Sequence, residues 1–244
     1  MCRNTATGGN RLTSFALRLT ALICMALDQL GLVLLPDASF LRAVGRLALP
    51  LYCFLLSEGY RHTRSLRRYG LRLVLLALLS EIPFDLVHFN TPFSPAGQNV
   101  VFTLCLSLLA LCCFDALRVK RPALCAVSVM LVCMAAMLLR SDYAAYGVLL
   151  TLCFYAFSDH PRRLAAGFAA LLALYLLQLY AAGAPATFLL LSPCALLALL
   201  PILLYNGRPG PRALRLGFYA AYPLGLFALY LIRNLRLVPP YWYL

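Results

Sequence analysis

Nine apolar runs, each long enough to form a helix, alternate along the chain with short polar segments. A helix that spans the hydrocarbon core of a bilayer needs about 20 mostly apolar residues, with a range of about 17–25. The second and sixth runs are short by this measure, which leaves a count of eight open. The runs are Leu17–Leu35, Leu41–Ser57, Leu71–His88, Asn99–Leu117, Ala123–Leu139, Tyr143–Phe157, Leu164–Ala181, Thr187–Tyr205 and Leu214–Ile232. The pattern predicts an all-α, polytopic transmembrane helix bundle of about nine spanning helices.

The segments between the runs are brief and contain proline, glycine or asparagine, as at residues 36–37, 90–92 and 206–209. No linker, low-complexity tail or second domain interrupts them. The first run is predicted to be a retained helix and not a cleavable signal peptide, because it carries Asp28 and continues to Leu35. We therefore expect residues 1–244 to form a single integral membrane domain.

The basic residues predict how the bundle is oriented. With the N-terminus in the cytoplasm, 16 of the 21 lysine and arginine residues fall on the inner side. The residues left on the outer side are Arg42, Arg46, Arg140, Arg233 and Arg236. This asymmetry follows the positive-inside rule and indicates a cytoplasmic N-terminus. The C-terminus then lies outside, with Tyr241, Trp242 and Tyr243 as an aromatic interface anchor.

Composition supports the membrane assignment and excludes other classes. The chain is 63% hydrophobic and 12% charged, whereas soluble domains have about half apolar and about a quarter charged residues. The net charge of +13 sits in short gaps between apolar runs, where topology requires it, and this placement argues against nucleic-acid binding. Ten cysteines form no CxxC pair and no Cys/His ligand spacing, so we expect no metal site.

Ionisable residues also occur within the apolar runs, where a charge costs several kcal/mol and persists when it is paired or functional. The predicted topology places this group in the outer half of the membrane: Asp28, Arg42, Arg46, Glu81, Asp85, Asn99 and Asp142, with Tyr146 nearby. One interpretation is that the charges tie helices together, for example Arg46 with Glu81. The other is a polar cavity open to the outer face. Both interpretations can hold together.

A second polar group is predicted at the inner mouth of the bundle. Glu58 and His62 lie four residues apart, on one face if the helix continues that far. Arginines flank them at Arg61, Arg64 and Arg68. Such a grouping suits contact with phosphate or pyrophosphate. A solvated loop that serves topology alone is the alternative.

Several distinctive motifs occur along the chain. The segment from Arg42 to Leu86 contains a GRxxxP run, an EGxxHT run, Tyr69 and the sequence SEIPFD. Further stretches are QNVVFTL at 98–104, SDYAAYGVLL at 141–150, and LLYNGRPG followed by AYPLGLFALYLIR. Together these motifs resemble the TraX family of bacterial membrane proteins, and the resemblance extends over nearly the whole chain.

The resemblance implies a multi-pass protein of the bacterial inner membrane that is associated with conjugation and pilin acetylation. Related membrane acyltransferases pass acetyl groups from cytoplasmic acetyl-CoA to acceptors across the bilayer. On this basis Glu58, His62, Arg61, Arg64 and Arg68 are expected to bind acetyl-CoA. Asp28, Arg46, Glu81 and Asp85 are expected to act on the acceptor amine. Asn99, Asp142 and Tyr146 are expected to line the outer cavity, and the pilin N-terminus is the acceptor that the family suggests.

The chain departs from the family pattern at two positions. Asp28 is followed by Gln29 where the family has histidine, and Leu224 is followed by Gly225 where the family again has histidine. Histidine is a natural general base, whereas glutamine and glycine cannot take a proton. Either Asp28 or Glu81 then serves as the base, or the chain is a non-catalytic binding or assembly factor. A solute transporter ranks last, because the sequence has no convincing internal repeat.

Overall fold

The computed structural model describes residues 12–208 and 215–235, which form helices joined by short connections. The first six helices are α1 (Ser14–Val33), α2 (Ser39–Gly45), α3 (Ala48–His62), α4 (Leu66–His88), α5 (Val100–Leu117) and α6 (Pro122–Leu138). They are followed by α7 (Ala144–Phe157), α8 (Pro161–Ala181), α9 (Ala186–Leu191), the 3₁₀ segment η1 (Ser192–Ala198), α10 (Leu199–Leu203) and α11 (Arg215–Asn234). No strand occurs among these residues, so the all-α prediction is confirmed.

The helices match the predicted runs closely and are those of a membrane protein. Five segments are long and apolar enough to cross a bilayer: Ser14–Val33, Ser39–His62, Val100–Leu117, Pro161–Ala181 and Ala186–Leu203. Helices α6 and α7 are apolar but shorter. Helices α4 and α11 coincide with the two remaining runs. The membrane helix bundle is thereby confirmed, while the count of nine spanning helices stays a prediction.

Several of the predicted features fall outside the described residues. They are the aromatic anchor at residues 241–243 and the arginines Arg3, Arg11, Arg212 and Arg236.

Two predicted runs are helical but interrupted, and proline explains both interruptions. The second run breaks between α2 and α3, at Arg46 and Leu47. Pro50 lies in the first turn of α3, and its ring would clash with the carbonyl group four residues earlier, which belongs to Arg46. The eighth run is divided into α9, η1 and α10, and Pro193 and Pro201 remove backbone donors from it.

The centre of the bundle is α3. Every residue from Ala48 to Ser57 except Tyr52 is buried there. Neighbouring helices approach closely at small residues: a methyl group added at Gly147 of α7 would lie 2.6 Å from Thr103 Cγ2 of α5. Peripheral helices keep large apolar side chains exposed, such as Leu79 of α4 and Leu138 of α6. In a bilayer these side chains face lipid, so the association of the helices depends on close packing and polar contacts.

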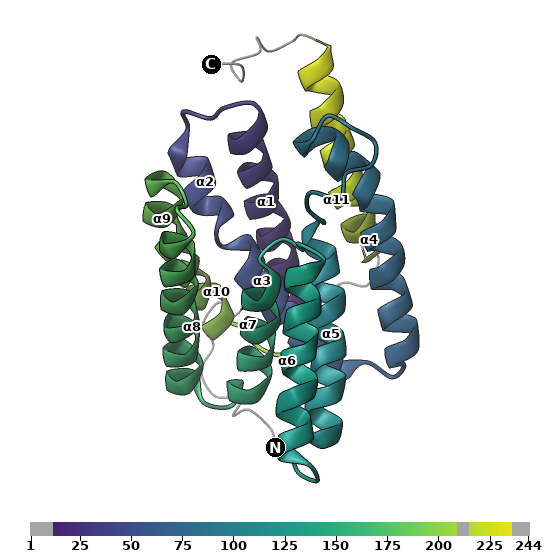
Figure 1. The fold of residues 1–244 in the computed structure, drawn as a ribbon, viewed down its shortest axis with the longest axis vertical. Helices are drawn as coiled ribbons and strands as arrows, with labels where there is room; N and C mark the ends of the chain where they lie inside the picture. Colours follow the sequence, from purple (N-terminus) through teal and green to yellow (C-terminus); the bar gives the residue numbers. More distant parts are fainter. Residues whose placement is uncertain (1–11, 209–214, 236–244) are drawn as a thin grey trace.

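The long helical segments alternate in direction along the chain, and α2 and α3 run the same way as parts of one segment (Figure 1). The start of α1 and the end of α11 lie at opposite ends of the bundle, and α4 and α11 run side by side along one flank. The connections α3–α4, α5–α6 and α7–α8 share one end, which we call the inner end. The connections α4–α5 and α6–α7 share the other, which we call the outer end. The described arginines that the sequence assigns to the cytoplasm are therefore gathered at the inner end.

Candidate functional site

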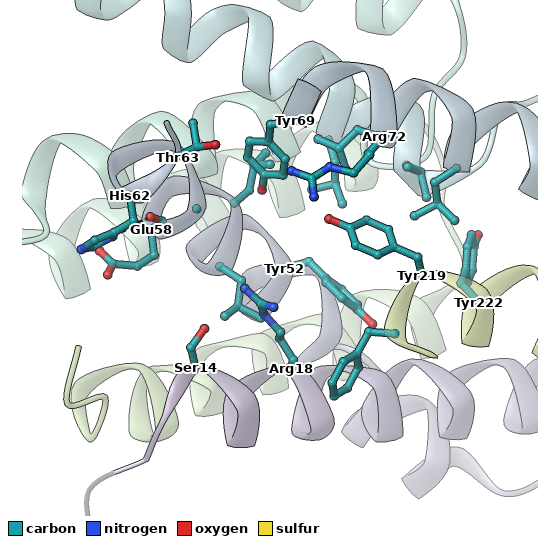
Figure 2. Close-up of a pocket in the computed structure, with 18 of the residues that line it drawn as sticks. Ser14, Arg18, Tyr52, Glu58, His62, Thr63, Tyr69, Arg72, Tyr219 and Tyr222 are labelled. Atoms are coloured by element: carbon teal, nitrogen blue, oxygen red, sulfur yellow. Dashed lines mark hydrogen bonds between the residues drawn. The ribbon is translucent and has the colours of Figure 1, made fainter. Parts of the chain in front are cut away.

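A cavity of about 920 Å³ opens at the inner end, between α1, α3, α4, α5 and α11. Its mouth carries polar and charged side chains, and its depth is lined by apolar and aromatic ones (Figure 2). Small-molecule sites typically enclose about 300–1,000 Å³, so the cavity is large enough for a ligand of coenzyme size. The mouth residues are Arg18, Glu58, His62, Thr63, Arg64 and Arg72.

The sequence identified part of this mouth. Glu58, His62 and Arg64 line the cavity as expected, and His62 Nδ1 lies 2.9 Å from the Glu58 carbonyl oxygen one turn earlier. Arg61 instead faces α7, where its guanidinium lies 4.8 Å from the centre of the Tyr155 ring. Arg68 is exposed in a neighbouring surface depression. Two of the five predicted donor-binding residues are therefore not part of the cavity wall.

Two arginines in the wall were not identified from the sequence. Arg18 projects from α1 and Arg72 from α4, and they point into the cavity from opposite sides (Figure 2). The Arg72 Nε–H group donates to the Arg68 carbonyl oxygen at 3.2 Å, which orients the guanidinium. Both residues lie just inside apolar runs rather than in the loops between them. Their position inside the runs could have indicated a functional role, because an arginine that serves only topology can lie in the loop.

The deep end of the cavity stops short of the outer polar groups. Met25 lines the cavity and lies three residues before Asp28, about 4.5 Å along the helix axis. Val100 also lines it and follows Asn99 directly. Tyr222 of α11 stands in the same region (Figure 2). About one helical turn of protein therefore separates a cavity that opens at the inner end from the charged groups of the outer end.

The first outer group surrounds the break between α2 and α3. Arg42 Nη1 lies 3.5 Å from Asp28 Oδ1 and forms an ion pair between α2 and α1. Arg46, at the break itself, is only 6% exposed. It donates from Nη1 to the Tyr143 hydroxyl at 3.0 Å, and its guanidinium lies 4.2 Å from the centre of the Phe188 ring.

Arg46 is only partly satisfied by these contacts. Its Nε and Nη2 atoms are buried and have no hydrogen-bond partner within the described part of the chain. The same is true of the Gln29 side-chain oxygen and the Tyr146 hydroxyl. Unpaired buried polar atoms are costly, and at several positions together they mark a candidate functional site rather than a structural one.

The second outer group joins α4 to the start of α5. Asn99 caps α5, since its side-chain oxygen accepts from the Val101 N–H at 3.0 Å. Its Nδ2 donates to Glu81 Oε2 at 2.5 Å and to the Ala77 carbonyl oxygen at 2.9 Å. Asp85, one turn beyond Glu81 and 1% exposed, accepts from the Ser94 N–H at 2.8 Å. The second oxygen of each carboxylate has no partner among the described residues.

Among the described residues, no hydrogen bond or ion pair joins the two outer groups. The ion pair of Arg46 with Glu81 that the sequence suggested is absent, because Arg46 contacts Tyr143 and Phe188 while Glu81 contacts Asn99. In the described ranges, the ion pairs are Asp28–Arg42 and Asp115–Arg118. The first of these pairs joins two helices, α1 and α2, whereas Asp115 and Arg118 lie three residues apart at the end of α5.

The remaining predicted residues lie close to the first outer group. Asp142 is exposed in the α6–α7 connection, where its carbonyl oxygen accepts from the Thr103 hydroxyl. Tyr146 is buried and its ring stacks on Tyr175 with the ring centres 4.4 Å apart. No three His, Cys, Asp or Glu residues of residues 12–208 and 215–235 are grouped to hold a metal ion.

The two positions where histidines are missing differ in their surroundings. Gln29 is half-buried beside Asp28. Gly225 is exposed on α11, and a methyl group added there would meet no atom within 4 Å. A side chain could therefore be accommodated at Gly225 without displacing a neighbour.

Comparison with known proteins connects this arrangement to a family. Residues 14–233 match the family model described as TraX protein. A relative from Dichelobacter nodosus, described as "Probable fimbrial assembly protein FimC, serogroup H1", is 34% identical over 232 residues. The aligned region covers 87% of this chain and 92% of that protein. No solved structure matches.

Proposed function

Because the chain belongs to the TraX family, we propose that it is a membrane acetyltransferase that moves an acetyl group from cytoplasmic acetyl-CoA to an amine acceptor. The proposal includes residence in the bacterial inner membrane. The acceptor we propose is a pilin N-terminus, since the Dichelobacter nodosus relative is described as a probable fimbrial assembly protein. A catalyst of this kind must admit a polyanionic donor from one side and place its acyl end near groups at the other.

The cavity at the inner end is the observation that carries the proposal. Its mouth has arginines and a histidine, which favour an anionic donor, and its depth has the apolar lining that a thioester arm requires. From Ser14 at the mouth to Met25 at the deep end, α1 rises about 16 Å. A donor bound head-first at the mouth would extend its acyl end toward the two outer groups.

The chemistry of transfer assigns roles to those outer groups. The acceptor nitrogen attacks the thioester carbonyl carbon, the C–S bond breaks, and the proton lost by the amine is balanced by protonation of the CoA thiolate. Glu81 is a better base than Asp28, because the Arg42 cation lies 3.5 Å from Asp28 Oδ1 and stabilises that carboxylate, whereas no cation of the described residues is ion-paired with Glu81. The unpaired Nε and Nη2 of Arg46 could stabilise the negative charge that develops on the carbonyl oxygen. Asp85 lies one turn from Glu81 on α4, so its carboxylate would face the same acceptor amine.

A second candidate function is a non-catalytic assembly factor. The observation that favours it is the pair of departures from the family pattern, Gln29 and Gly225. The printed description of the Dichelobacter nodosus relative concerns assembly and names no reaction, which is compatible with this alternative.

A transfer assay with purified protein separates the two candidates. The protein is reconstituted in vesicles with acetyl-CoA and a pilin precursor, and the acceptor is analysed by intact-mass spectrometry. We expect the mass of the acceptor to rise by one acetyl group only when donor and protein are both present. An acceptor of unchanged mass, with the protein folded and able to bind the precursor, would favour the assembly factor.

A further inference from the structure

The mouth of the inner cavity brings two guanidinium groups together without a carboxylate between them. Arg18 and Arg72 reach it from helices α1 and α4, which lie on opposite sides (Figure 2). Within the described chain neither is ion-paired, and Glu58 is the acidic residue of the cavity wall. Like charges repel in a half-buried site, so their convergence is unfavourable unless an anion binds there.

Tyrosine hydroxyl groups complete the arrangement. Tyr69 and Tyr219 line the cavity together with Arg18 and Arg72, and the four side chains stand around one space (Figure 2). Tyr69 can approach α3 closely because Gly59 lacks a side chain: a methyl group there would lie 2.7 Å from the Tyr69 hydroxyl oxygen. The cluster therefore offers two guanidinium forks and two hydroxyl donors to a ligand at the mouth.

The backbone adds positive potential at the same place. Helix α4 begins at Leu66, and Ser65, which follows Thr63 and Arg64 of the cavity wall, caps its first turn. A helix N-terminus favours negative charge. The mouth thus combines the three features that phosphate groups require, namely cations, neutral donors and a favourable backbone dipole.

We propose that Arg18, Arg72, Tyr69 and Tyr219 form a binding site for a diphosphate group, with one phosphate held by each arginine. The inference rests on the proposed function, because the diphosphate would be that of the coenzyme donor. Arg72 is oriented by its bond to the Arg68 carbonyl and presents its terminal amino groups to the ligand. From Arg18 to Met25, α1 rises about 10 Å, so a donor held here by its diphosphate directs its other end inward.

Binding measured by calorimetry in nanodiscs of phosphatidylcholine tests the site. The probes are CoA, inorganic pyrophosphate, and pantetheine, which has no phosphate. We expect CoA to bind, pyrophosphate to compete with it, and pantetheine to bind far more weakly. Loss of a charge-assisted bond of about 1.5–3 kcal/mol should weaken CoA binding about tenfold or more in both Arg18→Gln and Arg72→Gln.

Three further variants separate ligand binding from general charge and from folding. Arg67→Gln removes an equal charge from the first turn of α4, where Arg67 is exposed and outside the cavity wall, and should leave CoA affinity unchanged. Arg72→Lys keeps the charge but loses the planar fork, so its affinity should be intermediate. Tyr69→Phe removes one hydroxyl donor and should weaken binding by a smaller factor.

The outcomes distinguish failure of this site from failure of the proposed function. If CoA binds and the Arg18 and Arg72 variants behave like Arg67→Gln, the diphosphate site is wrong while the donor proposal stands. If pyrophosphate binding depends on both arginines but CoA does not bind, the site is supported and the donor proposal fails. If neither probe binds in phosphatidylcholine, nanodiscs containing phosphatidylglycerol decide the source of the phosphate. Lipid retained through Arg18 and Arg72 would then assign the site to the single phosphate of a headgroup, and this result, like the absence of any dependence on the two arginines, would overturn the diphosphate site.

Discussion

The two ends of the bundle treat charged side chains in opposite ways. At the inner end, Arg18 and Arg72 line an open cavity and lack carboxylate partners among the described residues. At the outer end, most charged groups contact other protein groups, as Glu81 contacts Asn99 and Arg42 contacts Asp28. The inner end therefore offers unpaired cations to an anionic ligand, whereas the outer end has only a few buried atoms without a hydrogen-bond partner among the described residues.

The free energy of placing a charged side chain at each depth explains the difference between the two ends. A charge in the hydrocarbon region costs several kcal/mol, so it persists there when partners or function compensate. Asp85 meets this condition through the Ser94 backbone, and Arg46 meets it only in part through Tyr143. Near the interface, water solvates an isolated arginine at little cost, whereas two guanidinium groups that converge in one cavity also repel each other. The partly satisfied groups at depth and the converging Arg18 and Arg72 are consequently more informative about function than the arginines of the loops.

The largest expected effect tests whether chemistry belongs to the outer end and donor binding to the inner end. Glu81→Gln keeps the size of the side chain and an acceptor oxygen for Asn99, but it removes the base. We expect kcat for acetyl transfer to fall by about 10²–10⁴. Acetyl-CoA affinity and the thermal unfolding midpoint should stay unchanged.

The matched comparison is Arg72→Gln, which should weaken donor binding and leave kcat at saturating acetyl-CoA unchanged. Steady-state kinetics with acetyl-CoA as the varied substrate measures both effects. If Glu81→Gln weakens donor binding, or if Arg72→Gln lowers only kcat, the assignment of the two ends is wrong.

A second prediction concerns the packing of α2 against α1 at the outer end. A methyl group added at Gly45 of α2 would lie 2.6 Å from Asp28 Cγ and would also collide with Asp28 Cβ and Oδ1 on α1. Gly45→Ala should therefore separate α1 from α2, strain the Asp28–Arg42 pair and destabilise the protein by about 2 kcal/mol. That loss corresponds to a fall of about 4–8 °C in the thermal unfolding midpoint, measured in detergent.

Gly70 of α4 supplies the control, because a methyl group there would lie 3.7 Å from Leu108 Cδ2, an ordinary contact. Gly70→Ala should be neutral or stabilising by about 0.4–1 kcal/mol, since alanine restricts the unfolded chain. Equal destabilisation by the two substitutions would show that the close approach of α1 and α2 does not carry the stability of the outer end.

The fold could be predicted from the sequence because a helix that crosses the lipid must be a long run of mostly apolar residues. Runs such as Asn99–Leu117 and Tyr143–Phe157 agree with α5 and α7 to within one residue. The breaks at Arg46 and within residues 186–203 were not predicted, although Pro50, Pro193 and Pro201 signalled them. Hydropathy reports only that a segment is apolar, and it does not show that a proline divides the segment.

The site could be predicted only in part because its contacts are distant in the chain. The sequence placed Glu58 and His62 at one mouth and Glu81 with Asn99 at the other end. It could not show that Arg46 would contact Tyr143 and Phe188, which are 97 and 142 positions away. The cavity could not be predicted either, because part of its wall forms only when α11 packs on α4 and α1.

The smallest expected effect decides whether the missing histidines matter. The variant combines Gln29→His, beside Asp28, with Gly225→His, where the added side chain meets no atom within 4 Å of its Cβ. If Glu81 already serves as the base, the parent protein transfers acetyl groups. The double variant should then change that rate by less than about tenfold, well below the ~10²–10⁴ of a general base.

Intact-mass measurement of the acceptor over time compares the two proteins, and Gly225→Ala with Gln29→Asn controls for the altered surfaces. An inactive parent with an active double-histidine variant would reverse the conclusion: the chain would be an assembly factor that kept the cavity and lost its base.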